Sequence, residues 1–410
     1  EAPSAGEDWR KLDSVFPEDD SCGSAMTPKM NWLDGRALKA LAVGALGAGL
    51  LALGACSERQ EVTAPAAESG GDFMVVANRP NNVHLVDLGA REVVRSCEVP
   101  GDFGPGTVAL SPDGQVAYVL SNRFENVYGI ALDSCEVVFS AIQSQGHERV
   151  KTIASIAVSP DGSELYTHQN PTLLLVDRYE VQDSRVAVFD TAAGLNAEPV
   201  RTLPAPRQVT IMATGEDGTL YMGGRDIYAM DVNSGETRIA LASQSLNDPL
   251  ESPRDSLTVW PLGGINGELV RMYSAARFVD ETQDMDTADW VWGYERIDLV
   301  TGEADSKVFG PLEVVLFSGM ARPSDRNQFF GALTQLKKFD VAAQKELMSV
   351  DLEHSYYCVN FSTDGSEVYL AGTYNDIAIY DADTLEKKGN IVLPGGDMAL
   401  ANTRVFKRAL

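Results

Sequence analysis

The segment Val108–Gly114 reads VALSPDG, and it recurs as IAVSPDG at Ile156–Gly162 and as VNFSTDG at Val359–Gly365. Each copy lies between short runs of β-branched and aromatic residues, such as the VAYVL run at Val116–Leu120. Asp-Gly suits a tight hairpin because glycine adopts the positive φ that the turn needs, and proline fixes φ at the turn's entry. The repeat therefore predicts pairs of antiparallel strands.

Copies of this unit follow one another at a spacing of roughly 40 to 55 residues, which is typical of the blades of a β-propeller. Weaker copies occur near Glu216 and Arg322, and the most diverged copy lies between Leu257 and Val308. From Phe73 onward no stretch carries a sustained helical period. We therefore predict an all-β fold.

Counting the units gives six with an opening strand and a first unit, Phe73–Val99, that has room for only three. The C-terminal segment Met398–Phe406 can supply the missing strand, which removes the exposed sheet edges of an open array. The prediction is a seven-bladed β-propeller of four-stranded blades, closed by the C-terminal strand in the first blade. Insertions at Thr167–Ser184 and Ser243–Ser256, and the acidic stretch Asp280–Asp289, are expected to form long loops suited to binding.

The first 71 residues are expected to lie outside the propeller. Arg36 and Lys39 precede an apolar and glycine-rich stretch, Ala40–Ala55, which has the layout of a secretory signal peptide starting at Met30. This divides the chain into an upstream segment at 1–29, a signal peptide at 30–56, a linker at 57–71 and the propeller at 72–410. Export to the periplasm follows from this interpretation. Cys56 ends a lipobox-like sequence, so plain cleavage and acylation with membrane anchoring both stay open.

Composition restricts the chemistry. The chain has 33 basic and 59 acidic side chains, and its formal net charge of −26 disfavours nucleic acid as a partner. Its four histidines lack the spacing of a metal pair, and no Cys-x-x-Cys-His motif for covalent haem occurs. We expect no catalytic, cofactor-binding or metal-binding residues in this chain.

The cysteines permit one cross-link in the propeller. Cys97 and Cys135 fall in similar places, the expected outer strands of the first two blades, and the periplasm allows oxidation. A disulfide needs Cα atoms within about 7 Å, whereas strands of adjacent blades diverge outward, so a disulfide and two free thiols both stay open. Cys358 is expected to be a small buried thiol.

Six segments resemble the β subunit of quinohemoprotein amine dehydrogenase, and the resemblance spans about residues 72 to 406. Residues 8–20 resemble the end of that enzyme's small γ subunit. The segments are Asn78–His84, Gly101–Thr107, Asn126–Ile130, Tyr356–Val359, Gly372–Asp376 and Leu393–Met398.

This resemblance implies a periplasmic heterotrimer that oxidises primary amines to aldehyde and ammonia. The cysteine tryptophylquinone cofactor belongs to the γ subunit and two haems c belong to the α subunit, so this chain is expected to be a scaffold without a cofactor. Residues expected at the subunit interface or the substrate cavity are Phe103, Asn126, Tyr374, Asn375 and Asp376.

Two other function classes stay open. A stand-alone binding propeller of the Tyr-Val-Thr-Asn repeat type would share the Ser-Pro-Asp-Gly pattern. A lactonase-like hydrolase propeller would need a central divalent cation, or the acidic loop could bind calcium. That loop, however, lacks the fixed glycine and regular alternation of a calcium loop, which favours a solvated surface. Its carboxylates are Asp280, Glu281, Asp284, Asp286 and Asp289.

Overall fold

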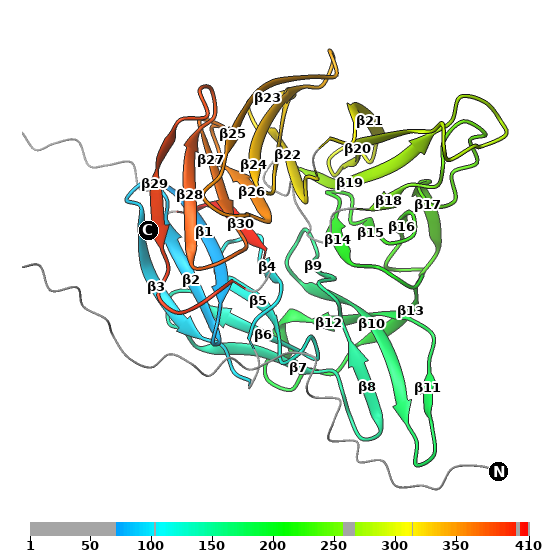
Figure 1. The fold of residues 1–410 in the computed structure, drawn as a ribbon. Helices are drawn as coiled ribbons and strands as arrows, with labels where there is room; N and C mark the ends of the chain where they lie inside the picture. Colours follow the sequence, from blue (N-terminus) through cyan, green and yellow to red (C-terminus); the bar gives the residue numbers. More distant parts are fainter. Residues whose placement is uncertain (1–70, 102–103, 257–266, 314, 399–401, 409–410) are drawn as a thin grey trace, which may run out of the picture. The chain divides into compact units, whose positions relative to one another are not determined.

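The computed structural model describes residues 71–101, 104–256, 267–313, 315–398 and 402–408, all within one unit, Ala64–Leu410. These residues form seven antiparallel sheets arranged as the blades of a propeller (Figure 1). Their only helical element is one turn of 3-10 helix, η2 (Thr191–Ala193). The predicted all-β, seven-bladed fold is confirmed.

The blades follow one another along the chain, and the strands of each blade lie in order from its inner to its outer edge. Blade 1 contains β30 (Thr403–Arg408), β1 (Gly71–Asn78), β2 (Asn82–Asp87) and β3 (Glu92–Glu98). Blade 2 contains β4 (Val108–Leu110), β5 (Val116–Ser121), β6 (Asn126–Ala131) and β7 (Val137–Ile142). Blade 3 contains β9 (Ile156–Val158), β10 (Glu164–Leu174), β12 (Arg185–Asp190) and β13 (Arg201–Pro204).

The remaining blades have the same order. Blade 4 contains β14 (Ile211–Thr214), β15 (Leu220–Gly223), β16 (Ile227–Met230) and β17 (Thr237–Leu241). Blade 5 contains β18 (Asp255–Ser256), β19 (Glu268–Arg277), β20 (Asp289–Asp298) and β21 (Ala304–Pro311). Blade 6 contains β22 (Ser318–Arg322), β23 (Asp325–Ala332), β24 (Gln335–Asp340) and β25 (Lys345–Asp351), and blade 7 contains β26 (Cys358–Phe361), β27 (Glu367–Ala371), β28 (Asp376–Asp381) and β29 (Lys387–Val392).

The C-terminal strand closes the ring in the first blade, as the sequence predicts. β30 pairs antiparallel with β1, and Phe406 lies opposite Phe73. The strand begins at Thr403, whereas Met398, the expected start, lies in the connection before it and donates its backbone N–H to Tyr374. Pairing the first and last strands of the propeller in one sheet leaves no open blade edge at the start of the ring.

The Asp-Gly turns have the predicted geometry. Gly114 and Gly162 have φ angles of 68° and 76°. Asp161 accepts hydrogen bonds from the Ser159 hydroxyl at 2.6 Å and the Ser163 backbone N–H at 3.0 Å. These hydrogen bonds lower the pKa of Asp161 to about 2, so its carboxylate stays charged and keeps the turn closed over the physiological range.

The core lies between neighbouring blades, because each sheet buries side chains on both faces. Tyr118 and Phe139 of blade 2 meet edge to face at 5.7 Å, and Phe139 meets Phe189 of blade 3 at 6.3 Å. Such contacts are favourable for aromatic rings, and they recur between blades 5 and 6 and between blades 6 and 7. The blades therefore stabilise one another through the faces of their sheets. The connecting turns lie outside this core, where they can contribute to binding.

One predicted loop is instead a sheet. The insertion at Thr167–Ser184 prolongs β10, whose far end pairs with β8 (Glu148–Lys151) on one side and β11 (Tyr179–Val181) on the other. We call residues 148–151, 170–174 and 179–181 the blade-3 arm (Figure 1). The loop prediction was wrong here because the strand-forming partner, β8, lies before the blade in the sequence and shows no pairing signal of its own.

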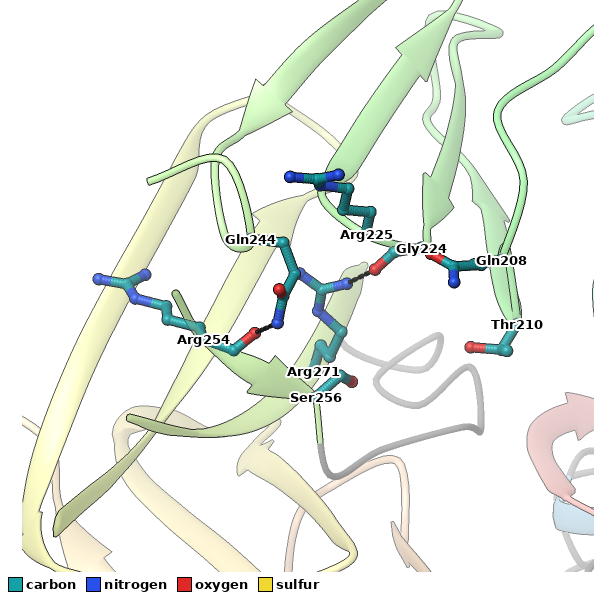
Figure 2. A pocket seen from close by; sticks show the side chains of 8 residues that line it. All are labelled: Gln208, Thr210, Gly224, Arg225, Gln244, Arg254, Ser256 and Arg271. Atoms are coloured by element: carbon teal, nitrogen blue, oxygen red, sulfur yellow. Dashed lines mark hydrogen bonds between the residues drawn. The ribbon is translucent and has the colours of Figure 1, made fainter. Parts of the chain in front are cut away.

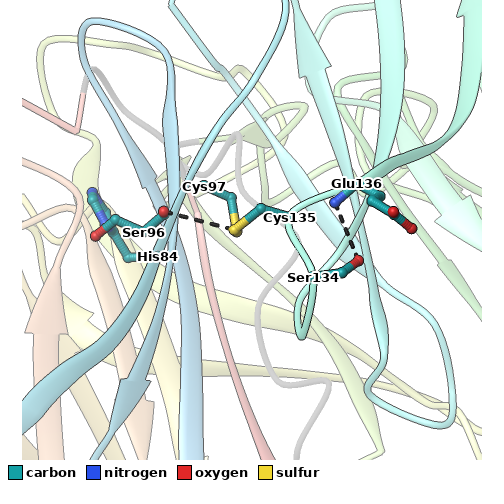
Figure 3. The surroundings of a disulfide bond; sticks show 6 residues. All are labelled: His84, Ser96, Cys97, Ser134, Cys135 and Glu136. Carbon is teal, nitrogen blue, oxygen red and sulfur yellow. Dashed lines mark hydrogen bonds between the residues drawn. A yellow bond between two sulfur atoms is a disulfide. The ribbon is translucent and has the colours of Figure 1, made fainter.

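A disulfide joins blades 1 and 2. The sulfur atoms of Cys97 and Cys135 lie 2.02 Å apart and the Cα atoms 5.1 Å apart (Figure 3). Cys97 is in the outer strand β3, as expected, but the expectation that Cys135 lies in an outer strand was wrong. Cys135 occupies the turn between β6 and β7 with a φ of 62°. The turn brings the thiol back toward blade 1, which is how the bond spans strands that diverge.

Candidate functional site

Four of the resembling segments meet in space where blade 7 borders blade 1. The Asn78 side chain donates to the carbonyls of Pro394 (2.9 Å) and Gly396 (3.0 Å). The Tyr374 carbonyl accepts the Met398 N–H at 2.7 Å. We call this region, formed by residues 78–84, 354–359, 372–376 and 393–398, the junction patch. Segments up to 318 positions apart in the sequence are thus hydrogen-bonded to one another.

His84 forms the buried base of the junction patch. Its ring nitrogens lie 2.8 Å from the Ser96 hydroxyl and 2.9 Å from the Asn78 side-chain oxygen. Burial lowers the pKa of His84 to about 4, only partly opposed by a hydrogen bond to the Pro394 backbone. The imidazole is neutral at physiological pH, and both of its ring nitrogens have hydrogen-bond partners in the fold.

A second histidine lies at the surface of the junction patch. His354 Nε2 is 2.9 Å from Asp376, which also accepts hydrogen bonds from the Tyr356 hydroxyl (2.7 Å) and the Asn390 amide (2.8 Å). Burial, together with the bond to Asp376, raises the pKa of Tyr356, so that hydroxyl stays a donor. The trio fixes the Asp376 carboxylate instead of leaving it free to react.

Tyr374 is the exposed tip of the junction patch, with 57% of its surface accessible. Its ring contacts the His354 ring edge to face at 4.6 Å, and its backbone N–H donates to Asp397 at 3.1 Å. The residue is held in the left-handed region with a φ of 50°, and the Asn375 amide donates to the Leu393 carbonyl at 3.2 Å. A large aromatic ring on a fixed backbone is the kind of group that anchors protein interfaces.

The remaining site residues from the sequence are placed differently. Asn126 is the first residue of β6 and directly follows the turn between β5 and β6 in blade 2. That turn corresponds to the turn of blade 7 that contains Tyr374. The Asn126 side chain is buried and donates to the Tyr128 hydroxyl at 3.2 Å, so it supports the turn from beneath. Phe103 lies outside the described residues, as do Cys56 and the predicted segments 1–29, 30–56 and 57–70.

Sequence reasoning missed His354 and Asn390. The spacing of histidines along the chain is the sequence signal that would reveal a histidine cluster. In this chain that spacing indicates no cluster, so it did not reveal His354. His354 meets Asp376 across 22 positions because the connection into β26 folds over the β27–β28 turn. Only the blade geometry brings these groups together.

A polar cavity of about 540 Å³ lies between blades 4 and 5 (Figure 2). Arg271 donates to the Gly224 carbonyl at 2.5 Å and to the fully buried Glu295 at 2.8 Å, and it also contacts the Ser243 hydroxyl. Arg254 pairs with Glu251 at 2.8 Å. These two guanidinium groups are thus engaged by protein carboxylates, and Figure 2 shows the Arg254 and Arg225 side chains pointing away from Thr210.

Metal and thiol chemistry find little support in the described ranges. Within them, no group of three or more His, Cys, Asp or Glu side chains is arranged to hold a metal ion. Burial raises the pKa of the Cys358 thiol to about 12, which makes it inert as a nucleophile at neutral pH. In the same part of the chain no helix has the length and apolar character to cross a membrane.

The architecture defines the class of protein as a seven-bladed β-propeller. No family model matches the chain. Subunit beta of hydrazine synthase from Kuenenia stuttgartiensis is 24% identical over 210 residues, covering 48% of this chain and 50% of that protein, so the match spans half the length of this curated relative.

Two solved structures are similar to this chain. The Kuenenia stuttgartiensis hydrazine synthase structure has a TM-score of 0.50 and 15% identity, covering 75% of this chain and 90% of the other chain. Dihydro-heme d1 dehydrogenase NirN in complex with DHE has a TM-score of 0.48 and 15% identity, covering 82% and 75%. At 15% identity, the likeness to the hydrazine synthase structure shows the propeller fold alone.

Proposed function

We propose that this chain is the propeller subunit of a periplasmic quinohemoprotein amine dehydrogenase. It would serve as a scaffold for a γ subunit carrying cysteine tryptophylquinone and an α subunit carrying two haems c. The complex would convert primary amines to aldehyde and ammonia, with no redox group on this chain. Export by the signal peptide at 30–56 would bring the chain to the periplasm, with a lipid anchor if Cys56 is acylated.

The junction patch carries the proposal. Four of the six segments that resemble the family are hydrogen-bonded to one another around the exposed Tyr374 ring. The other two segments, Gly101–Thr107 and Asn126–Ile130, lie outside the patch. The meeting of four segments around a fixed and exposed aromatic side chain supports a shared binding role at that surface.

A second candidate is the corresponding subunit of a hydrazine synthase. The 24% identity to its subunit beta favours this candidate, although the match covers half of each chain. Both candidates give this chain the same role, that of a propeller subunit in a larger enzyme. They differ in the partners and in the reaction.

The test is affinity purification of the full chain from periplasmic extract, followed by haem staining, mass spectrometry and an assay of amine-dependent dye reduction. We expect a dihaem cytochrome and a small cross-linked quinone protein to copurify with amine dehydrogenase activity. Partners that form hydrazine without amine oxidation would favour the second candidate. Recovery of the folded chain alone, without haem, would refute both and favour a stand-alone binding propeller.

A further inference from the structure

We propose that protonation of His354 is a switch that fixes the exposed tip of the junction patch. The tip is the turn at residues 372–375 between β27 and β28, which carries Tyr374. With its charged imidazolium ring, His354 holds this turn in one conformation, and loss of a ring proton loosens it. The proposal deepens the proposed function by giving the same surface a regulation, and it rests on that function only for the identity of the docking protein.

The groups around His354 Nδ1 accept a hydrogen bond from it and offer none. Nδ1 lies 2.9 Å from the Ser355 carbonyl oxygen and 3.4 Å from the Thr373 hydroxyl oxygen. A carbonyl oxygen only accepts, and a threonine hydroxyl has one proton to donate. Thr373 donates that proton to the same Ser355 carbonyl. Nδ1 must therefore carry a proton to bond with either group.

The other ring nitrogen of His354 also faces an acceptor. Nε2 lies 2.9 Å from Asp376 Oδ1. The second oxygen of that carboxylate accepts hydrogen bonds from Tyr356 and Asn390. An ionised carboxylate only accepts, so Nε2 must carry a proton as well. Neutral imidazole has one N–H and imidazolium has two, so the imidazolium form alone satisfies both contacts at once.

The charges nearby also favour the imidazolium. Glu353 pairs with Lys387 of β29 at 2.6 Å, and this hydrogen bond lowers the pKa of Glu353. Asp376 is only 9% exposed, and its other hydrogen-bond donors are neutral, so loss of the His354 charge leaves a largely buried carboxylate without a positive partner. The charged and titratable groups around His354 and the turn are Glu353 and Tyr356 in the connection before β26, Tyr374 in the turn, Asp376 and Tyr380 on β28, Lys387 on β29 and Asp397 after β29.

His354 is coupled to the turn through its ring as well as through Thr373 and Asp376. Its centroid lies 4.6 Å from that of Tyr374 and 4.1 Å from that of Tyr356. Tyr374 has a φ of 50°, which a residue with a side chain keeps only when surrounding contacts hold it. A cation is attracted to a phenol ring and forms the stronger hydrogen bond to a carboxylate, so proton loss weakens both kinds of contact. We therefore expect the turn to be fixed at acid pH and looser at alkaline pH.

This pH dependence differs from that of the other histidine of the junction patch. His84 has a pKa of about 4, so it stays neutral above pH 6, and its effect on stability has the opposite sign. Histidine ordinarily changes its charge between pH 5 and pH 8, which gives the range in which to look. Under the proposed function, docking is weaker at alkaline pH because the partner must order the turn as it binds.

The test uses the full chain alone, labelled with ¹⁵N in its four histidines. In nuclear magnetic resonance spectra we expect the His354 ring to carry two protons at pH 6 and one at pH 9. The Tyr374 and Met398 amides bond within the patch. Their protection from hydrogen exchange, corrected for the intrinsic rate, should fall about five- to tenfold over that range. His354→Gln should show the lower protection at both pH values.

The matched control is His147→Gln, which replaces an exposed histidine in the turn before β8 and should keep the wild-type response. Thermal melting verifies that both variants are folded. The switch is overturned if the wild-type His354 ring carries the same number of protons at pH 6 and pH 9, or if it loses a proton while both amides keep their protection. These results concern the chain alone. The proposed function fails separately, when no haem or quinone protein copurifies.

Discussion

The blade-3 arm and the hairpin of blade 5 both extend a propeller blade, but they are built differently. In the arm, three strands pair in register and one face is buried against the ring. In blade 5, β19 and β20 pair along ten residues and are joined by residues 278–288, whose hydrogen bonds are largely local, such as Asp280 with Thr282 at 2.9 Å. The arm therefore presents the fixed surface of a paired sheet. The connection at residues 278–288 is held mainly by its own turns, and it presents mainly charged side chains.

The two extensions also differ in what lies beneath them. The blade-5 hairpin grows from strands that hold the buried pair Arg271 and Glu295, whose Nη2–Oε2 distance is 2.5 Å. The blade-3 arm is braced by Arg185 and Glu148, both of which stay partly accessible to water. The hairpin is therefore anchored by a buried ion pair, in which removal of either partner would leave an unpaired buried charge. The arm depends mainly on backbone pairing and packing.

The largest expected effect is the loss of the ring on which both extensions rest. Ending the chain at Asn402 removes β30 and leaves the inner edge of β1 unpaired. We expect no cooperative unfolding transition by circular dichroism, because blade 1 loses its inner strand and its contact with the rest of the ring. Ending the chain at Arg408 is the control and should melt like the full chain.

The next largest effect is a difference in stability loss between variants of two ion pairs, Arg271–Glu295 under the blade-5 hairpin and Arg185–Glu148 under the arm. Glu295→Gln leaves the Arg271 charge buried without its partner, and we expect it to lower the free energy of unfolding by about 3 to 5 kcal/mol. Glu148→Gln, under the arm, should cost less than about 1 kcal/mol since water screens that pair. Urea denaturation of both variants measures the contrast, and equal losses would contradict it.

The disulfide should stabilise blades 1 and 2 by an intermediate amount. Cys97→Ala/Cys135→Ala opens a cross-link between residues 38 positions apart, and we expect a loss of about 2 to 4 kcal/mol. Hydrogen exchange should show the loss of protection in β3 and β7 and leave the arm unchanged. Equal loss in the arm would mean that the arm depends on the junction of blades 1 and 2.

The smallest expected effect is a pH dependence confined to the junction patch. His84 has a pKa near 4 in the fold and near 6.5 when unfolded, so the unfolded chain binds the proton more readily between these values. Its contribution to stability is complete above pH 6.5 and decreases as the pH falls toward 4, by about 2 kcal/mol between pH 7 and pH 5. Hydrogen exchange at pH 7 and pH 5 should show faster opening of β1 and β2 at the lower pH, while the arm stays unchanged. His84→Asn should remove that difference.

The repeated turn sequences were sufficient to predict the blades. Asp161 and Gly162 act through hydrogen bonds to residues two or three positions away, so their role is visible in a short window of sequence. Of the candidate residues found through resemblance, Tyr374 is exposed and Asn375 is half-buried. Asn126 and Asp376 are buried. Exposure depends on which blade packs alongside, and that information is not local.

The sequence by itself determined the strand type, the blade repeat and the need for a closing strand from the C-terminus, because hairpin turns and alternating side chains act over a few residues. Only the tertiary structure decided the meeting of His354 with Asp376, the bond from Cys97 to Cys135 and the pairing of β8 with β10. These contacts depend on the angle between neighbouring blades and on the path of their connections. Those features arise from packing over the whole ring, which no single segment encodes.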